Sequence, residues 1–131
     1  MGFLVEIITP KGIYLSENIE SLTIKLTTGY RTFLAGHLPL IGSLGYGSMH
    51  FIQNGETRNF AVHGGAINVR KEKTTIICNA IEEAKDIDEA RAIRAKERAE
   101  ARLKEKTDNL DVKRAELALQ RAIARLETIG K

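Results

Sequence analysis

A change in composition near residue 80 constrains the fold of this chain more than any other feature of its sequence. All seven aromatic residues precede residue 61, and ten of the eleven glycines precede residue 66. From Ala84 to Ala124 the chain instead holds ten alanines among Glu, Lys, Arg and Leu, which are strong helix formers. The earlier part is rich in Val, Ile, Thr and Gly, as strands and turns are. The sequence therefore predicts a β unit followed by an α unit.

Short strands and turn signals fill the β unit. Residues 22–26 alternate apolar and polar side chains with period two, as a half-buried strand does. Residues 9–12 carry a Pro and a Gly that mark a turn, and Asn54-Gly55 suits a two-residue hairpin turn between residues 49–53 and 57–62. Many short strands at close spacing are typical of an antiparallel β-sandwich or a flattened barrel. We expect this domain to span residues 1–84.

Two helices are expected in the α unit, residues 85–131. Asp86 can cap a first helix from about 87 to 106, and Glu89, three residues after Asp86, can complete a capping box. A break at 107–109 precedes a second helix from about 110 to 129. Helices joined by so short a link lie antiparallel, so the fold class is α+β, with a C-terminal two-helix hairpin.

Small apolar side chains form a stripe on each predicted helix, at steps of three and four residues. The stripes consist of Ala92, Ala95 and Ala99 on the first helix, and Ala115, Leu119, Ala122, Leu126 and Ile129 on the second. Alanine buries little area, at roughly 25 cal/mol per Å², so the hairpin is expected to be only marginally stable by itself. A marginal element of this kind can move.

Several functional classes are disfavoured by composition. The formal charge of +3, from 20 basic and 17 acidic residues, is small for a nucleic-acid-binding protein, and the α unit lacks aromatic residues to stack on bases. No apolar run reaches the roughly 18 residues of a membrane span, and the N-terminus lacks the pattern of a signal peptide. The single cysteine, Cys78, lies in an apolar run and is interpreted as a buried strand residue.

Catalytic and metal-binding patterns are also missing from the sequence. His37, His50 and His63 have no metal-ligand spacing, so we interpret them as structural and predict no metal site. Gly64-Gly65 is not followed by the Gly-Lys-Ser/Thr pattern of a phosphate-binding loop and is interpreted as a turn or bulge. Without a nucleophile motif or a matched acid and base, the chain is not expected to be an enzyme.

Arginines recur along both predicted helices at helical spacing. They are Arg91, Arg94, Arg98 and Arg102 on the first helix, and Arg114, Arg121 and Arg125 on the second. The ordinary interpretation is a pair of solvated faces, since glutamates lie nearby. The alternative is that folding of the hairpin gathers a subset into a cluster suited to phosphate oxygens. Spacing alone does not identify the subset.

Four segments carry a resemblance that extends over the whole chain. Residues 8–12, 35–40, 62–69 and 113–119, on a β unit followed by an Ala-rich hairpin, resemble the epsilon subunits of bacterial F-type ATP synthases. The resemblance implies a rotor subunit of the central stalk, peripheral to the cytoplasmic face of the cell membrane. It also implies that the sandwich packs on the gamma subunit and the c-ring. The hairpin would lie folded on the sandwich, or extend toward the alpha and beta subunits and inhibit ATP hydrolysis.

A regulatory ATP site is a further implication of the resemblance. Some family members bind ATP on the folded hairpin through Ile/Leu-Asp-x-x-Arg-Ala, which residues 87–92 match. Glu82 would approach the adenine, and the arginines would serve the phosphates. The implied residues are Glu82, Ile87, Asp88, Arg91, Ala92, Arg98, Arg121 and Arg125. Without the ligand, Asp88 is a first-turn carboxylate favoured by the helix dipole. An alternative function is an ATP-sensing hairpin with little inhibitory action.

Subunit contacts are implied by the resemblance at five further positions, Tyr30, Arg31, His37, Lys113 and Arg114. The family commonly carries an acidic residue, a second glycine and a proline in the segment before the histidine, and this chain lacks all three. The departure at Tyr30 and Arg31 leads us to expect a different ring loop opposite this segment.

Overall fold

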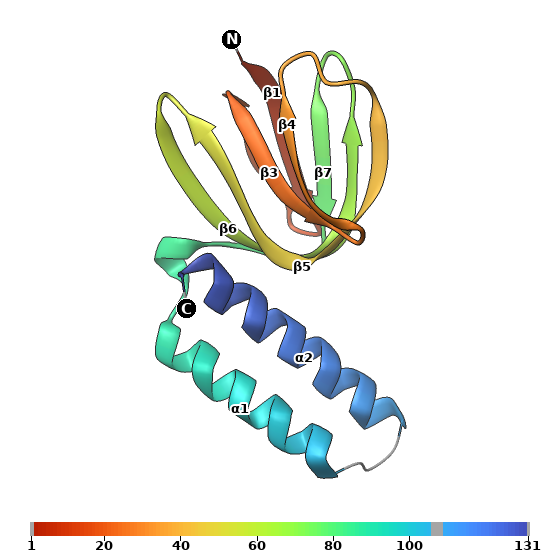
Figure 1. Ribbon diagram of the computed structural model, residues 1–131, viewed down its shortest axis with the longest axis vertical. Helices are drawn as coiled ribbons and strands as arrows, with labels where there is room; N and C mark the ends of the chain where they lie inside the picture. The colour runs from red at the N-terminus through yellow and green to blue at the C-terminus, as the bar shows by residue number, and fades with distance from the viewer. Residues whose placement is uncertain (1, 106–108, 131) are drawn as a thin grey trace.

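The computed structural model describes residues 2–105 and 109–130. The strands are β1 Phe3–Thr9, β2 Gly12–Ile19, β3 Ser21–Leu26, β4 Gly29–Leu34, β5 Leu40–Gln53, β6 Glu56–Val69, β7 Thr74–Cys78 and β8 Ile81–Glu83. A 3-10 helix, η1 (Ala84–Asp86), leads to α1 (Glu89–Glu105) and α2 (Asn109–Thr128). The predicted order of a β unit and an α unit is therefore confirmed (Figure 1).

One bent sheet forms both layers of the β unit. Its strand order is β2-β1-β7-β6-β5-β3-β4, with β8 paired to the first half of β6. The long strands β5 and β6 bend together at the end nearest the helices and so contribute to both layers (Figure 1). Neighbouring strands are antiparallel except β1 and β7, which pair in parallel. The path begins at β2 and ends at β4 without closing, so the structure is a sandwich and not a barrel.

Residues at positive φ shape the β5–β6 pair at its turn and at its bend. At its tip, Asn54 and Gly55 have φ of 53° and 79°, as the predicted hairpin turn requires. At the bend, Gly64 and Gly65 have φ of 73° and 132°, and here β6 exchanges its partner β8 for β7. A Cβ on Gly65 would lie 2.0 Å from the carbonyl oxygen of Ile77. The predicted turn or bulge is thus a bend within one continuous strand.

The hydrophobic core lies between the two layers and belongs to the sandwich alone. Its buried members all fall between Val5 and Cys78. Phe33, Phe51 and Phe60 are completely buried, and the rings of Phe51 and Phe60 lie 5.2 Å apart. Because this core needs no residue from the helices, the sandwich is built to keep its fold when the hairpin moves.

The thiol of Cys78 is expected to be inert in the native protein. Its residue is 2% exposed, and burial raises the pKa of the thiol to about 11, so almost no thiolate exists at pH 8. We expect negligible reaction with an aromatic disulfide reagent in buffer and rapid reaction in urea, measured by the absorbance of the released thiolate. Native reaction at the rate of free cysteine would contradict this placement.

Helix α1 begins later than the sequence predicts. Asp88, and not Asp86, caps it: the Asp88 Oδ1 accepts a hydrogen bond from the backbone N–H of Arg91 at 3.1 Å. Asp86 lies instead in η1, so the prediction of a cap at Asp86 and a helix from residue 87 was wrong. Of the predicted break at 107–109, residues 107 and 108 lie outside the described residues, and residue 109 begins α2.

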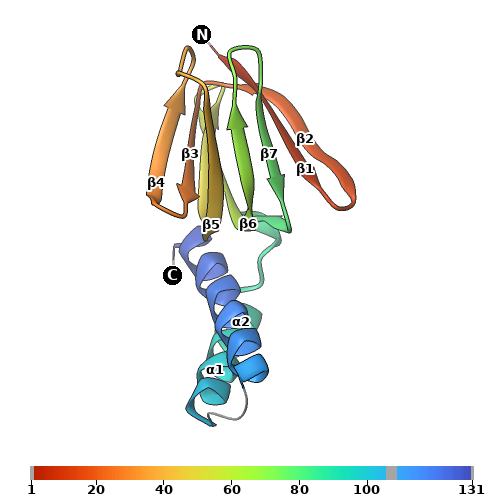
Figure 2. The same cartoon turned by 90° about the vertical axis from the view of Figure 1, so that its right-hand side faces the viewer.

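The helices form the expected antiparallel hairpin, and α2 lies against the sandwich (Figures 1 and 2). Small side chains fill the contact between helices, with Ala92 and Ala99 of α1 and Ala115 and Ala122 of α2 almost completely buried. Helix α2 also contacts β5 and β6, whereas α1 lies on its far side (Figure 1). The sandwich therefore holds α1 mainly through α2.

Candidate functional site

A pocket of about 550 Å³ opens between the helical hairpin and the segment that leads into it. Its volume falls in the range of about 300–1,000 Å³ that is typical of small-molecule sites. The lining residues are Glu82, Asp86, Ile87, Asp88, Arg91, Ala92, Arg94, Ala95, Arg98, Ala118, Arg121 and Arg125. The structure thus brings all eight residues of the implied nucleotide set to one pocket.

Four lining residues were not in that set, namely Asp86, Arg94, Ala95 and Ala118. Helical spacing could have found two of them, because Arg94 and Ala95 follow Arg91 by three and four residues on the same face of α1. Ala118 could not be assigned from sequence, since its place depends on how the helices pack.

Positive charge dominates the pocket. Five arginines, three from α1 and two from α2, face it together with three carboxylates. Arg102 and Arg114 line a separate pocket of about 320 Å³ toward the link between the helices. The structure thus identifies which of the helical arginines gather in one cluster, which their spacing in the sequence did not. Among the described residues, Arg125 alone of the five pocket arginines forms an ion pair. The other four have donors to offer an anion.

Glu82 joins the pocket to the sandwich. Its Oε1 accepts hydrogen bonds from Arg125 Nε at 2.7 Å and from His63 Nε2 at 3.1 Å. Partial burial opposes ionisation of this carboxyl, but the two hydrogen bonds and the charge of Arg125 outweigh it and hold the pKa of Glu82 below its usual value. Glu82 is therefore ionised at neutral pH and holds Arg125, on α2, to β8.

His63 lies beneath this ion pair, on β6 at the bend. Its side chain is 2% exposed, and its Nδ1 has no hydrogen-bond partner among the described residues. Burial lowers the pKa of His63, and the nearby Arg125 and Arg121 lower it further, against the opposing effect of Glu82. The imidazole is thus neutral in the docked structure at neutral pH, as expected of a structural histidine.

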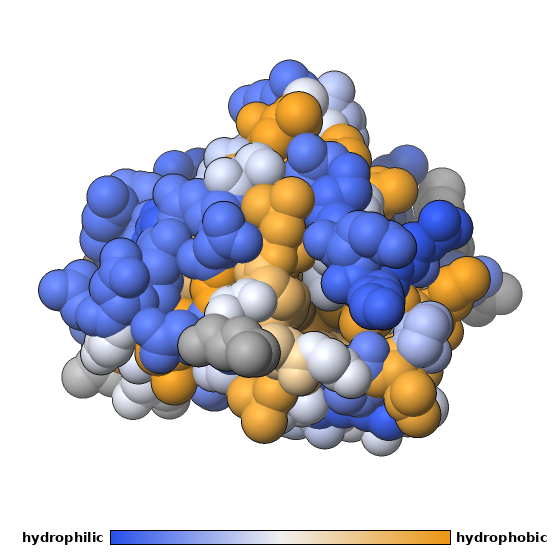
Figure 3. Space-filling view, turned by 90° about the horizontal axis from the view of Figure 1, so that it is seen from above, coloured by the Kyte–Doolittle hydropathy of each residue, from blue (hydrophilic) through white to orange (hydrophobic). Residues whose placement is uncertain are grey.

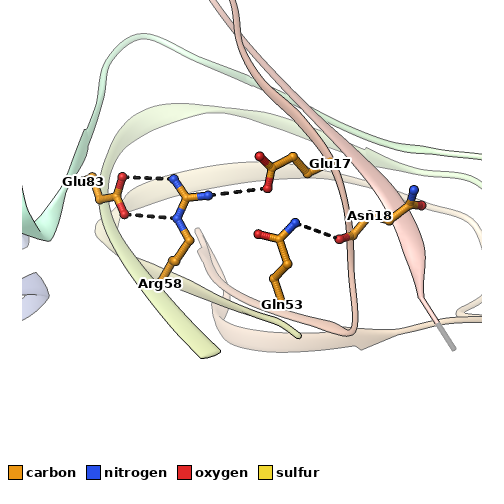
Figure 4. Close-up of polar contacts among 5 residues, drawn as sticks. All are labelled: Glu17, Asn18, Gln53, Arg58 and Glu83. Atoms are coloured by element: carbon orange, nitrogen blue, oxygen red, sulfur yellow. Dashed lines mark hydrogen bonds and ion pairs between the residues drawn. The ribbon is translucent and has the colours of Figure 1, made fainter. Parts of the chain in front are cut away.

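A second ion pair fixes β8 on the sandwich. Figure 4 shows Arg58 donating from Nε and Nη2 to the two carboxylate oxygens of Glu83, both at 3.1 Å, with Glu17 at 3.5 Å from Nη1. The guanidinium also lies over the rings of Phe51 and Phe60, at 5.3 and 5.4 Å from their centroids. This bidentate contact positions the residue next to Glu82 and so anchors one wall of the pocket.

The five implied subunit-contact residues do not form one surface. Tyr30 and Arg31 lie near the start of β4, at the end of the sandwich that faces the helical hairpin. The Tyr30 hydroxyl donates a hydrogen bond to Glu127 of α2 at 3.1 Å. His37 lies in the loop at the opposite end, after β4, with its ring against Phe33. The other two, Lys113 and Arg114, are exposed on α2. Tyr30 therefore serves the docked hairpin in this structure.

Within the described residues, no three His, Cys, Asp or Glu side chains gather as a metal site would require. The same residues contain no helix that is both long and apolar enough to cross a membrane.

The chain matches a family in two consecutive parts. Residues 3–84 match the family described as "ATP synthase, Delta/Epsilon chain, beta-sandwich domain", and residues 85–130 match its "long alpha-helix domain". An ATP synthase epsilon chain of Bacillus velezensis is 41% identical over 126 residues, 96% of each chain. One from Bacillus cytotoxicus is 42% identical over 125 residues, 95% of this chain and 94% of the relative.

Solved structures agree on the fold. A chain of the Euglena gracilis mitochondrial ATP synthase, in a structure of its OSCP/F1/c-ring, superposes with a TM-score of 0.86 at 22% identity, covering 96% of this chain and 79% of that one. A chain of the Tetrahymena thermophila central stalk and c-ring gives a TM-score of 0.57 at 17% identity, covering 66% and 69%. The chain therefore belongs to the epsilon subunits of F-type ATP synthases, non-catalytic components of the central stalk.

Proposed function

We propose that the folded hairpin binds ATP in the arginine-lined pocket. The observation that carries this proposal is the convergence of Arg91, Arg94, Arg98 and Arg121, none of which has an ion-pair partner among the described residues. Like charges brought together repel one another, and a polyphosphate would relieve the repulsion through bidentate hydrogen bonds. An anion that bridges α1 and α2 also closes the hairpin.

Each part of the pocket suits a different part of a nucleotide. The arginines of both helices would hold the phosphates, and Ile87 and Ala92 supply apolar surface for a base. Asp88 uses Oδ1 to cap α1 and thereby keeps Arg91 in place. Glu82 fixes the Arg125 guanidinium and remains at the wall where the resemblance places the adenine.

ATP bound here would act as a regulatory ligand. It stabilises the docked hairpin by mass action, by about 2.7 kcal/mol at a concentration one hundred times its dissociation constant. When ATP is scarce, the hairpin leaves the sandwich, extends along the stalk toward the alpha and beta subunits, and restrains ATP hydrolysis. The alanine-lined helix contact is suited to such a change, because it has little apolar area to lose.

The sandwich is the part that we propose to dock on the rotor, at the cytoplasmic face of the membrane. Figure 3 looks onto its end away from the hairpin, where hydrophobic side chains gather between hydrophilic regions. Leu34, Leu38 and Ile41 at that end are 59%, 79% and 79% exposed. Exposed apolar side chains in one region mark a contact surface. We assign this end to the gamma subunit and the c-ring.

Calorimetry on the full chain tests the nucleotide site. We expect saturable heat on titration with ATP, and a loss of affinity of at least about tenfold for Arg91→Ala and for Arg125→Ala, since charged hydrogen bonds contribute about 1.5–3 kcal/mol each. Arg70→Ala, in the β6–β7 link, is the matched control and should bind as the wild type does. The absence of binding heat across several temperatures for the wild type would exclude the site.

A further inference from the structure

The structure links the docking of α2 to a buried histidine. One carboxylate oxygen, Glu82 Oε1, accepts from both His63 of β6 and Arg125 of α2. Glu82 is ionised, so the neutral imidazole carries its proton on Nε2, which leaves Nδ1 as the bare nitrogen. That nitrogen is fully buried and has no partner in the described part of the chain.

We propose that His63 makes hairpin docking pH-sensitive: a proton taken up at Nδ1 disfavours the docked state and releases α2 from the sandwich. The proposal does not depend on nucleotide binding. It concerns the empty chain and the contact between β6, β8 and α2.

A second proton on the docked imidazole is costly for two geometric reasons. It creates an N–H donor at Nδ1 in a buried position where the described residues offer no acceptor, and an unsatisfied buried donor costs about 1–3 kcal/mol. It also places a second cation on the oxygen that already holds the Arg125 guanidinium, 2.7 Å away. In the undocked state water can solvate Nδ1, and Glu82 is free to pair with the imidazolium alone.

The charged groups around His63 also favour the neutral imidazole in the docked state. The charged and titratable groups that face it are Glu82 on β8, Arg121 and Arg125 on α2 and Tyr46 on β5, with Arg91, Arg94, Arg98, Asp86 and Asp88 across the pocket. The hairpin thus brings more positive than negative charge toward the imidazole. Removing α2 takes away Arg121 and Arg125 and leaves Glu82, which favours protonation.

The direction of the effect follows from proton linkage. At alkaline pH both states hold a neutral imidazole, and docking does not depend on the protonation of His63. As the pH falls, the undocked state takes up the proton first, because docking holds the pKa of His63 below its ordinary value of 6.5. Docking therefore weakens on acidification. Protonation of Glu82 would weaken docking further only at a pH below 4.5, the usual pKa of this carboxyl. The pH range in which His63 acts is therefore separate from that of Glu82.

Energy transfer between two dyes on the full chain tests the proposal without ATP. The dyes are attached at Glu72→Cys, at the far end of the sandwich, and Gln120→Cys on α2, both exposed, while Cys78 stays buried. The release of α2 is followed in urea at pH 7.5 and pH 5.5, which gives the docking equilibrium at each pH. We expect this equilibrium to weaken by up to about tenfold at pH 5.5, one unit below the ordinary pKa.

Two variants and one direct titration make the outcome decisive. His63→Gln keeps an amide donor toward Glu82 but takes no proton, so its docking should be the same at both pH values; His50→Gln should respond as the wild type does. NMR titration of the wild-type histidines should place the pKa of His63 below 6.5. Equal docking at the two pH values in the wild type, or a His63 pKa at or above 6.5 in the docked chain, would overturn the proposal. Neither result bears on ATP binding.

Discussion

Deleting residues 87–131 should raise the rate of ATP hydrolysis by the reconstituted ATP synthase about fivefold or more. This expectation follows from the proposal that the extended hairpin restrains hydrolysis, with a coupling energy of at least about 1 kcal/mol. The deletion leaves the whole hydrophobic core in place, as well as β8 with its Arg58–Glu83 anchor. The remaining sandwich should therefore still assemble, and hydrolysis is measured in a coupled assay at limiting ATP.

The same experiment separates the two functions that the sequence left open. Co-purification of the truncated chain with the gamma subunit is the control that the sandwich is present in the complex. With that control satisfied, unchanged hydrolysis would reject inhibition by the hairpin. If the full chain still bound ATP in calorimetry, the ATP-sensing hairpin with little inhibitory action would then be the correct function.

Replacing Gly65 with alanine should destabilise the sandwich by about 2–6 kcal/mol, the sum of backbone strain and overpacking. The φ of 132° is unfavourable for any L side chain, and the added Cβ would lie 2.0 Å from the Ile77 carbonyl oxygen and 2.7 Å from the Cys78 Cα. Both neighbours are backbone atoms of β7, so neither can move aside without breaking the pairing of β6 with β7. Thermal melting should show a loss of more than about 10 °C.

Gly12→Ala is the matched control for that substitution. Its φ of 117° is similarly unfavourable, but a Cβ there would meet no atom of the described residues within 4 Å. It should therefore lose only the strain contribution, about 1–3 kcal/mol, and melt well above Gly65→Ala. Equal melting temperatures for the two variants would show that close packing at the β6 bend does not contribute.

Most of the secondary structure could be predicted because it depends on residues close together in the chain. The alanine-rich composition after residue 84 favours helix wherever it is placed, and Asn54-Gly55 adopts positive φ for local steric reasons. The cap of α1 is an exception. Asp86 and Asp88 are equally suitable as helix caps by residue type, but Asp86 is part of η1, so Asp88 caps α1.

The long-range pairing of strands could not be predicted from the sequence. Nothing local indicates that β1 pairs with β7 in parallel, or that β5 and β6 bend at Gly64-Gly65 and enter both layers. The sandwich and the flattened barrel share the same strand patterns, since both bury one face of each strand. Only the absence of pairing between β2 and β4 distinguishes them.

The chemistry of the pocket shows the same division. The sequence by itself determined that arginines would lie on both helices, and the resemblance singled out a motif at residues 87–92. Only the tertiary structure decided that Arg94 joins the pocket while Arg102 and Arg114 do not. It alone brought His63 and Arg125 to the same carboxylate oxygen of Glu82. Spacing along a helix fixes the face on which a side chain lies, but the packing of that face against distant elements fixes what the side chain meets.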